Sequence, residues 1–116
     1  MDDPTRRAIA YIAARLAGQR DSGSVYDHDA RKHFHFSGQV EPGSVSIYDF
    51  STRSHIGGSP TSLYHFGNRR HMTLTVSGQT FQGFDFASGS HFSGTISGSS
   101  VTVFDYGSRR HHHYSV

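Results

Sequence analysis

Five copies of one short unit follow one another along residues 24–116 of this 116-residue chain. Each copy runs through an aromatic residue, an Asp or His, a ring residue, a turn and a His, and then a second alternating stretch. The copies are SVYDHDARKHFHFSG, SVSIYDFSTRSHIGG, TSLYHFGNRRHMTLTVSG, TFQGFDFASGSHFSGTISG and SVTVFDYGSRRHHHYSV. Two alternating runs joined by a short turn are typical of a β-hairpin. The repeat therefore predicts five hairpins, or about ten antiparallel strands.

Side chains alternate across a strand, so the repeat also predicts two faces. We assign the apolar face to the core, with an Asp at its turn end in four copies. Its members are Val45, Ile47, Phe34, Phe36, Val40, Met72, Leu74, Val76, Phe81, Phe92, Ile96, Val101 and Val103, with Asp27, Asp49, Asp85 and Asp105. The other face is aromatic and half-wet, with Tyr48, Tyr64, Phe84 and Phe104. In the last turn, Gly107 to Arg110, the register predicts that Tyr106 lies opposite His111, and the other copies follow.

An amphipathic helix is predicted over residues 4–17, before the repeats. Asp3 is a suitable N-cap, Pro4 fits the first turn, and Gly18 is a natural stop. An apolar stripe of Ala8, Ile9, Ile12 and Leu16 recurs at helical spacing, which leaves Arg6 and Arg7 to face water. Residues 18–23 read as a linker, so we expect a single domain over residues 1–116.

A flat meander of ten strands would leave its aliphatic face exposed and two edges unpaired. Two arrangements solve this problem: closure into an up-and-down barrel with the helix packed on or near its end, or pairing of two sheets in a homodimer. We expect a mainly β fold, an antiparallel up-and-down meander that is curled or barrel-like. In architecture only, it resembles MORN-type hairpin arrays. That family's regular Gly-x-Gly is absent, so the resemblance implies no function.

Composition narrows the functional classes. The chain has no Cys, which excludes disulfides and thiolate metal sites. Its first segment matches neither a signal peptide nor a membrane span, so we expect a cytoplasmic protein without membrane contact. No nucleophile motif, Walker loop or dinucleotide fingerprint is present, so the sequence predicts neither an enzyme nor a cofactor.

Two sets of residues invite a chemical interpretation but favour a structural one. The chain has ten His, and some of them, including His111 to His113, could bind a metal. The His of the repeats recur once per hairpin beside the turn, so no metal site is predicted. The Asp row could bind Ca²⁺ or supply paired acids. An Asp before a turn more simply accepts the N–H groups of that turn.

Basic hairpin tips beside aromatic rings form the third candidate, a surface for anions. The residues selected for binding are Arg69, Arg70, Arg109, Arg110, His71, His91 and His111. Arginine can contact phosphate or other anionic groups while rings stack on bases or sugars. The net charge of only +2 argues against strong general binding of nucleic acid.

The function predicted from the sequence is a binding or self-assembly module, with homo-oligomers formed through the helix and the aromatic face. One alternative is RNA, single-stranded nucleic acid or anionic glycan binding at the Arg-rich tips. Another is a small-ligand carrier with a cavity inside the barrel. In the closing stretch VTVFDYGSRRHHHYSV, only His112 departs from its equivalents in the other copies, which are Phe34, Ile56, Met72 and Phe92.

Overall fold

The computed structural model describes residues 1–18 and 23–116. Most of the predicted linker, residues 19–22, lies outside the described residues. The rest contains one helix, α1 (Asp3–Leu16), and ten strands. The strands are β1 (Ser24–Asp27), β2 (Lys32–Glu41), β3 (Ser44–Asp49), β4 (Ser54–Ser59), β5 (Ser62–His65), β6 (Arg70–Ser77), β7 (Thr80–Asp85), β8 (Ser90–Ser97), β9 (Ser100–Asp105) and β10 (Arg110–Ser115).

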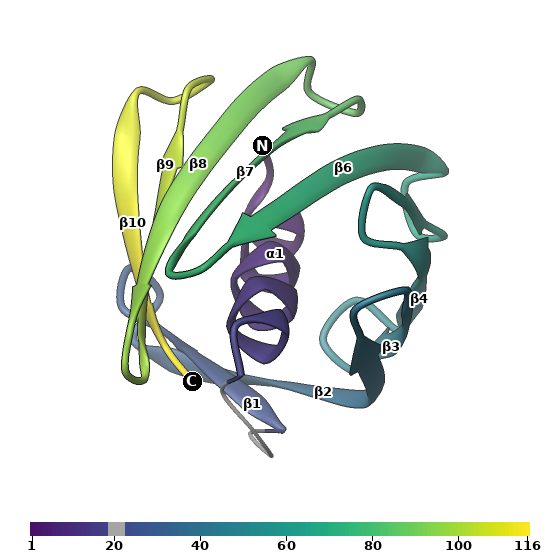
Figure 1. Ribbon diagram of the computed structural model, residues 1–116, viewed down its shortest axis with the longest axis horizontal. Coiled ribbons are helices and arrows are strands. Elements are labelled where there is room, and N and C mark those ends of the chain that lie inside the picture. The colour runs from purple at the N-terminus through teal and green to yellow at the C-terminus, as the bar shows by residue number, and fades with distance from the viewer. Residues whose placement is uncertain (19–22) are drawn as a thin grey trace.

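The ten strands close into an antiparallel up-and-down barrel, as the repeat predicts (Figure 1). Each strand pairs with its neighbours in sequence, and β1 pairs with β10 to complete the ring. That seam is short: its Cα partners are Tyr26 with Ser115 and Asp27 with Tyr114. Closure removes both open edges of the meander, which is the problem that the sequence posed.

The helix runs inside the barrel, not on or near its end (Figure 1). All residues from Thr5 to Ala14 are buried, and α1 contacts β1, β2, β6 and β9. About eight strands give an interior that side chains alone can fill, so a ten-stranded barrel has room for more. The predicted exposure of Arg6 and Arg7 is therefore wrong, because their exposed fractions are 5% and 6%.

The helix also begins one residue earlier than predicted. Asp2, not Asp3, is the N-cap, and its side chain accepts a hydrogen bond from the Thr5 N–H at 2.9 Å. The helix ends at Leu16, one residue before the predicted end, with Ala17 as the C-cap. Gly18 follows with φ +97°, a left-handed conformation that glycine adopts readily.

The assignment of the two strand faces holds for most of the core. Strand residues such as Ile47, Leu74 and Val103 are buried in one core cluster with the helix residues, and the Tyr11 ring stacks on Phe36 with centroids 4.7 Å apart. Three members of the predicted core face are only partly buried: Phe34, Val40 and Val76.

The predicted register at the hairpin tips is wrong by two residues. His111 lies opposite Phe104, and Asp105 lies opposite Arg110, so Tyr106 belongs to the turn. A backbone hydrogen bond of 2.8 Å from the Arg109 N–H to the Asp105 carbonyl closes that turn, and Arg109 has φ +57°. A shift of two residues keeps every side chain on its face, which is why the face assignment survived the error.

Candidate functional site

Three rings pack together at each hairpin tip on the outer wall of the barrel. In β7–β8 the Phe84 ring contacts Phe86 of the turn and His91 of the next strand, each with centroids 4.8 Å apart. The same unit recurs in the other hairpins as Tyr26, His28 and His33; Tyr48, Phe50 and His55; Tyr64, Phe66 and His71; and Phe104, Tyr106 and His111. Most contacts are edge-to-face, a favoured geometry for aromatic pairs.

The turn rings remain exposed even though they pack on a strand ring. Phe50, Phe66, Phe86 and Tyr106 have exposed fractions of 54%, 57%, 55% and 54%. The first hairpin carries His28 at this position. A row of half-exposed rings on a protein surface commonly marks an interaction site.

A backbone hydrogen bond places each of these rings beside the His of the preceding hairpin. The Phe86 N–H donates to the His71 carbonyl, and the Tyr106 N–H donates to the His91 carbonyl, both at 3.1 Å. The Phe66 N–H donates to the His55 carbonyl at 2.9 Å. The ring of one hairpin and the His of its neighbour therefore frame a groove between them.

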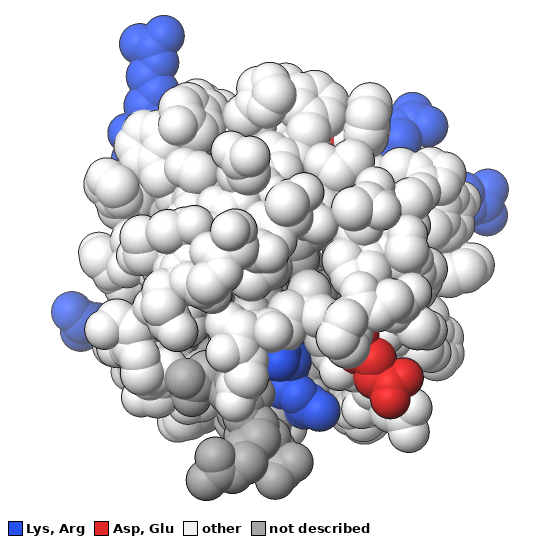
Figure 2. Space-filling model, viewed as in Figure 1, with Lys and Arg blue, Asp and Glu red and all other residues white. Residues whose placement is uncertain are grey.

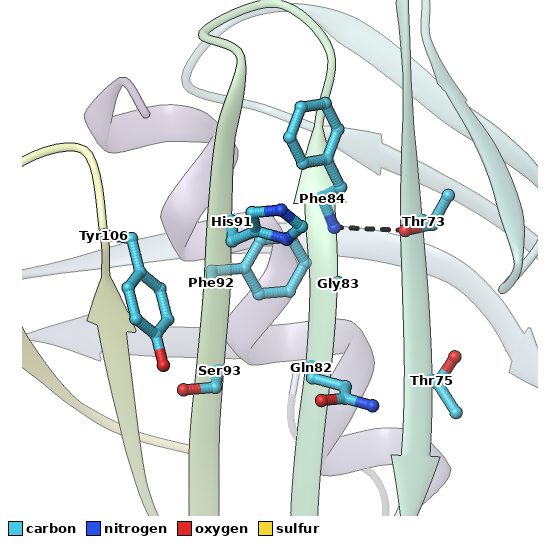
Figure 3. Close-up of a pocket in the computed structure, with 9 residues that line it drawn as sticks. All are labelled: Thr73, Thr75, Gln82, Gly83, Phe84, His91, Phe92, Ser93 and Tyr106. Carbon is cyan, nitrogen blue, oxygen red and sulfur yellow. Dashed lines mark hydrogen bonds between the residues drawn. The ribbon is translucent and has the colours of Figure 1, made fainter.

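Three described grooves share this frame: Phe66 with His55, Phe86 with His71, and Tyr106 with His91. The groove of about 470 Å³ beside Tyr106 is shown in Figure 3. Polar side chains also line it: Thr73, Thr75, Gln82 and Ser93. Thr73 Oγ1 accepts a hydrogen bond from the Phe84 N–H at 3.0 Å, which holds two adjacent strands of the wall together.

Beneath this groove, a glycine lets a core ring pack closely against the inner side of the wall. A Cβ added to Gly83 would lie 2.5 Å from the Phe92 ring and 1.9 Å from the Thr73 carbonyl oxygen. No side chain fits there, so the Phe92 ring packs directly beneath the backbone of Gly83, where it is only 1% exposed. The groove thus combines an aromatic wall with hydroxyl, amide and imidazole groups.

The residues predicted for binding are divided among several places. Arg69, Arg70 and His71 come together in the groove beside Phe86. His91 lines the next groove, and His111 lines a shallower one with Phe104. Arg109 lies in the β9–β10 turn, and Arg110 borders a separate pocket at the seam. The exposed turn rings, absent from the predicted set, complete the grooves.

Four of the turn arginines adopt an unusual backbone conformation. Arg31, Arg53, Arg69 and Arg109 have φ between +54° and +58°, whereas the fourth hairpin uses Gly89 at this place with φ +69°. A left-handed conformation costs a non-glycine residue about 1–2 kcal/mol. Glycine adopts this conformation at a lower cost, as Gly89 does in the fourth hairpin.

The Asp row caps the turns, in agreement with its structural interpretation. Asp105 Oδ1 accepts a hydrogen bond of 2.9 Å from the Gly107 N–H, and Asp49 accepts one from the Ser51 N–H. Asp27 and Asp85 do the same in their hairpins, and His65 Nδ1 accepts from Gly67 in the third. These groups lie at the barrel end that also holds the start of α1.

The buried helix arginines meet two of these carboxylates. Arg6 lies 3.2 Å from Asp105 and donates to the Tyr114 hydroxyl, while Arg7 lies 3.4 Å from Asp27. Burial raises the pKa of Asp105. The hydrogen bond from the Gly107 N–H and the nearby terminal ammonium lower that pKa by a larger amount, so it lies below its ordinary value. Burial also raises the pKa of Tyr114, which keeps that phenol protonated.

A charged pocket lies beside this cluster, at the seam between the last hairpin and the first. It is lined by Met1, Asp3, Arg6, Asp29, Ser108, Arg110 and His112. Asp29 Oδ2 lies 2.7 Å from His112 Nδ1, and this hydrogen bond lowers the pKa of Asp29. The sequence singled out His112 but not its partner. Asp29 could have been found by the same comparison, because the other hairpins have Ser51, Gly67, Ala87 and Gly107 at its position.

Two further observations concern groups that the described part of the chain lacks. Within it, no three His, Asp or Glu side chains gather as metal ligands. No described helix has the length and apolar character needed to span a membrane.

The fold and site define a β-barrel closed around a central helix, with repeated grooves on its wall. Neither a family model nor a curated protein nor a solved structure matches the chain.

Proposed function

We propose that the protein is a multivalent binding module that holds an anionic glycan in the grooves between its hairpins. The observation that supports this most directly is the recurrence of one groove, framed by an exposed ring and a histidine, at three places on the wall. Repetition multiplies weak sites, and several weak contacts to one polymer combine into a much tighter interaction.

The lining suits a sugar. Sugar rings offer apolar C–H faces to aromatic side chains and hydroxyl groups to polar ones. In the groove of Figure 3, Tyr106 and Phe84 supply the aromatic surface, and Gln82, Ser93 and His91 supply donors and acceptors. A few polar groups set among apolar ones are typical of ligand sites.

The arginines at the turns favour a negatively charged ligand. Arg69 and Arg70 border the groove beside Phe86. Figure 2 shows Lys and Arg side chains projecting at separate points around one face, with other residues between them. Non-specific binders of single-stranded nucleic acid use a continuous basic groove that follows the phosphates. Basic side chains that are separated in this way, with Arg69 and Arg70 lining one groove, favour a glycan instead.

Calorimetric titration with a heparin-derived tetrasaccharide at low salt tests this proposal by counting sites. We expect more than one site per chain, and binding that weakens as salt screens the charges. Replacing the ring in Phe86→Ala should remove one site, whereas the same truncation at Gln79, in an exposed turn, should leave the number unchanged.

Two double substitutions with equal changes in charge provide a second comparison. Arg69→Ala/Arg70→Ala removes two cations beside the exposed Phe86 ring. Arg109→Ala/Arg110→Ala removes two cations at a tip whose neighbour around the barrel, the first hairpin, has His28 in place of the exposed aromatic ring. Only the first should weaken a groove site. A flat titration contradicts the proposal. One-to-one binding of a 20-nucleotide oligouridylate, weakened equally by both pairs and without saccharide binding, would favour nucleic acid.

Self-association is a second candidate, supported by the exposed rings of Phe50, Phe66 and Phe86. The helix lies inside the barrel, so these rings, and not the helix, would form the contact. Sedimentation equilibrium should show a concentration-dependent increase in mass that is lost when the three rings are replaced by Ser. A wild-type protein that stays monomeric at millimolar concentration argues against this candidate. The carrier alternative needs the interior that α1 occupies.

A further inference from the structure

Ser108, His112 and Asp29 form a line of polar contacts at the seam of the barrel. Asp29 Oδ2 lies 2.7 Å from His112 Nδ1, and Ser108 Oγ lies 3.4 Å from His112 Nε2. A carboxylate at Nδ1 favours the tautomer with its proton on that nitrogen, which leaves Nε2 as an acceptor facing the serine hydroxyl. This is the order of nucleophile, base and orienting carboxylate in serine hydrolases.

We propose that these three residues form an acyl-transfer site that hydrolyses small carboxylic esters, a function beyond the glycan binding proposed for the outer wall. A contiguous motif is not required, because such triads are recognised by geometry and not by sequence order. The Ser–His separation is longer than a normal hydrogen bond, and ligand-free nucleophile–base pairs are often loose in this way.

The repeat supplies an independent argument. His112 replaces an apolar residue of the core face, and its side chain is only 5% exposed. Asp29 is the only acid at its turn position among the five hairpins. The two exceptions come from opposite ends of the repeat array and contact each other. A need shared by all the hairpins would recur in every copy, whereas a chemical site, or a contact specific to the seam, needs to occur only once.

The surroundings suit an ester. Ser108 is exposed at the rim of an open pocket of about 500 Å³, while His112 lies buried behind it. Arg110 lines the same pocket and supplies a cation for the oxygen that becomes negative when the ester carbonyl is attacked. Arg6 also lines it but is already bound to Asp105. We therefore assign the oxyanion contact to Arg110.

The reaction is balanced without a cofactor. The Ser108 Oγ forms a bond to the ester carbonyl carbon as its proton passes to His112 Nε2. The bond from that carbon to the alcohol oxygen then breaks, and the proton passes to the departing alkoxide. Water, deprotonated by the same nitrogen, next attacks the acyl-serine carbonyl. The bond from that carbon to Ser108 Oγ breaks, the proton returns from His112 Nε2 to Ser108 Oγ, and the carboxylic acid leaves. Asp29 is a positioning residue, because it orients the imidazole and touches no reacting atom.

The competing explanation is that the His112–Asp29 pair only fastens the seam. Ser108 Oγ also lies 3.4 Å from the Asp105 carbonyl, so its hydroxyl has another acceptor. A purely structural pair affects the melting temperature but gives the serine no reactivity. Serine labelling therefore separates the two explanations.

Labelling with a fluorophosphonate probe, followed by peptide mass spectrometry, tests the nucleophile directly. We expect the probe on Ser108 and its loss in His112→Phe, which gives the last hairpin the Phe that hairpin four has at this position. Ser88 is the matched control, because it occupies the same turn position but has Phe92 in place of the histidine. Equal labelling of Ser88 and Ser108, or of neither, overturns the proposal.

Hydrolysis of 4-nitrophenyl acetate gives the second readout. Free histidines hydrolyse this ester without a serine, so the comparison is between wild type and Ser108→Ala, an exposed substitution that leaves the core intact. We expect at least a tenfold loss of kcat, with Ser88→Ala unchanged. Asp29→Asn should lower kcat more than it raises KM and shift the pH profile, which a structural role would not do. An unchanged rate in Ser108→Ala contradicts the proposal.

Discussion

Replacing Arg6 by Met tests the charge arrangement inside the barrel. The Arg6 side chain is 6% exposed and is bound to Asp105 and to the Tyr114 hydroxyl, at 3.2 and 3.1 Å. Met has a similar length but removes the guanidinium, which leaves the terminal ammonium as the remaining cation beside the buried Asp105 carboxylate. Breaking a buried pair in this way costs about 3–5 kcal/mol. For a domain of this size 1 kcal/mol shifts Tm by roughly 4 °C, so we expect Tm to fall by about 12–20 °C.

Urea denaturation followed by circular dichroism measures the free energy of unfolding. Arg53→Met is the matched control, because Arg53 is exposed at a hairpin tip and should change stability by about 0.5 kcal/mol or less. The double variant Arg6→Met/Asp105→Asn should be more stable than the sum of its single losses predicts, since it removes both charges. Additive losses, or a loss below about 1 kcal/mol for Arg6→Met, would refute the argument.

Three further substitutions or conditions test the packing and the pKa shifts. Ile12→Ala should lower the free energy of unfolding by about 2–5 kcal/mol in urea denaturation, because Ile12 lies fully buried inside the barrel. Gly94→Ala should cost about 1–3 kcal/mol by the same measurement, since its Cβ would lie 2.2 Å from the Phe81 ring, whereas Gly43→Ala meets nothing within 4 Å and should be nearly neutral. The pKa of Asp105 is lowered in the folded state, so its contribution is present above the ordinary carboxyl pKa of about 3.9 and lost as the pH falls through the folded value. Acid unfolding monitored by circular dichroism should therefore be less steep in Asp105→Asn.

The barrel was predictable because apolar and polar residues alternate along every strand of the repeat. A shift of the strand pairing by two residues leaves residues such as Ile47 and Val103 facing inward. The assignment of the faces was therefore unaffected by the two-residue error at the tips. The register itself depended on the left-handed conformation of Arg109. Sequence rules reserve that conformation for glycine or asparagine, and they therefore placed the turn one residue too late.

The position of the helix could not be predicted from its own sequence. A stripe of Ile9 and Ile12 indicates one buried face, and Arg6 and Arg7 normally indicate an exposed one. Inside the barrel every face is buried, and the arginines are accommodated only because Asp105 and Asp27 stand at the turn end of β9 and β1. The sequence shows both the arginines and the aspartates, but which arginine pairs with which aspartate is decided only when the strands close into a barrel.

The candidate site was also predictable only in part. The sequence identified Arg69, Arg70 and His71, which are close in the chain, but not Phe86, which reaches the same groove from the next hairpin. Likewise it marked His112 as an exception without finding Asp29, because the two meet only when the barrel closes. Contacts within one hairpin can be predicted from spacing, whereas contacts between hairpins depend on closure.

Closure gives the two proposed sites different relations to the fold. A groove exists wherever two hairpins are adjacent, so the wall can bind one ligand at several equivalent places, and losing one ring removes one site. The seam exists once, where β10 meets β1, and it alone brings together residues from the first and last copies. A repeat protein that needs one unique site finds it most simply at such a junction. His112 and Asp29, the two departures from the repeat that contact each other, lie at that junction.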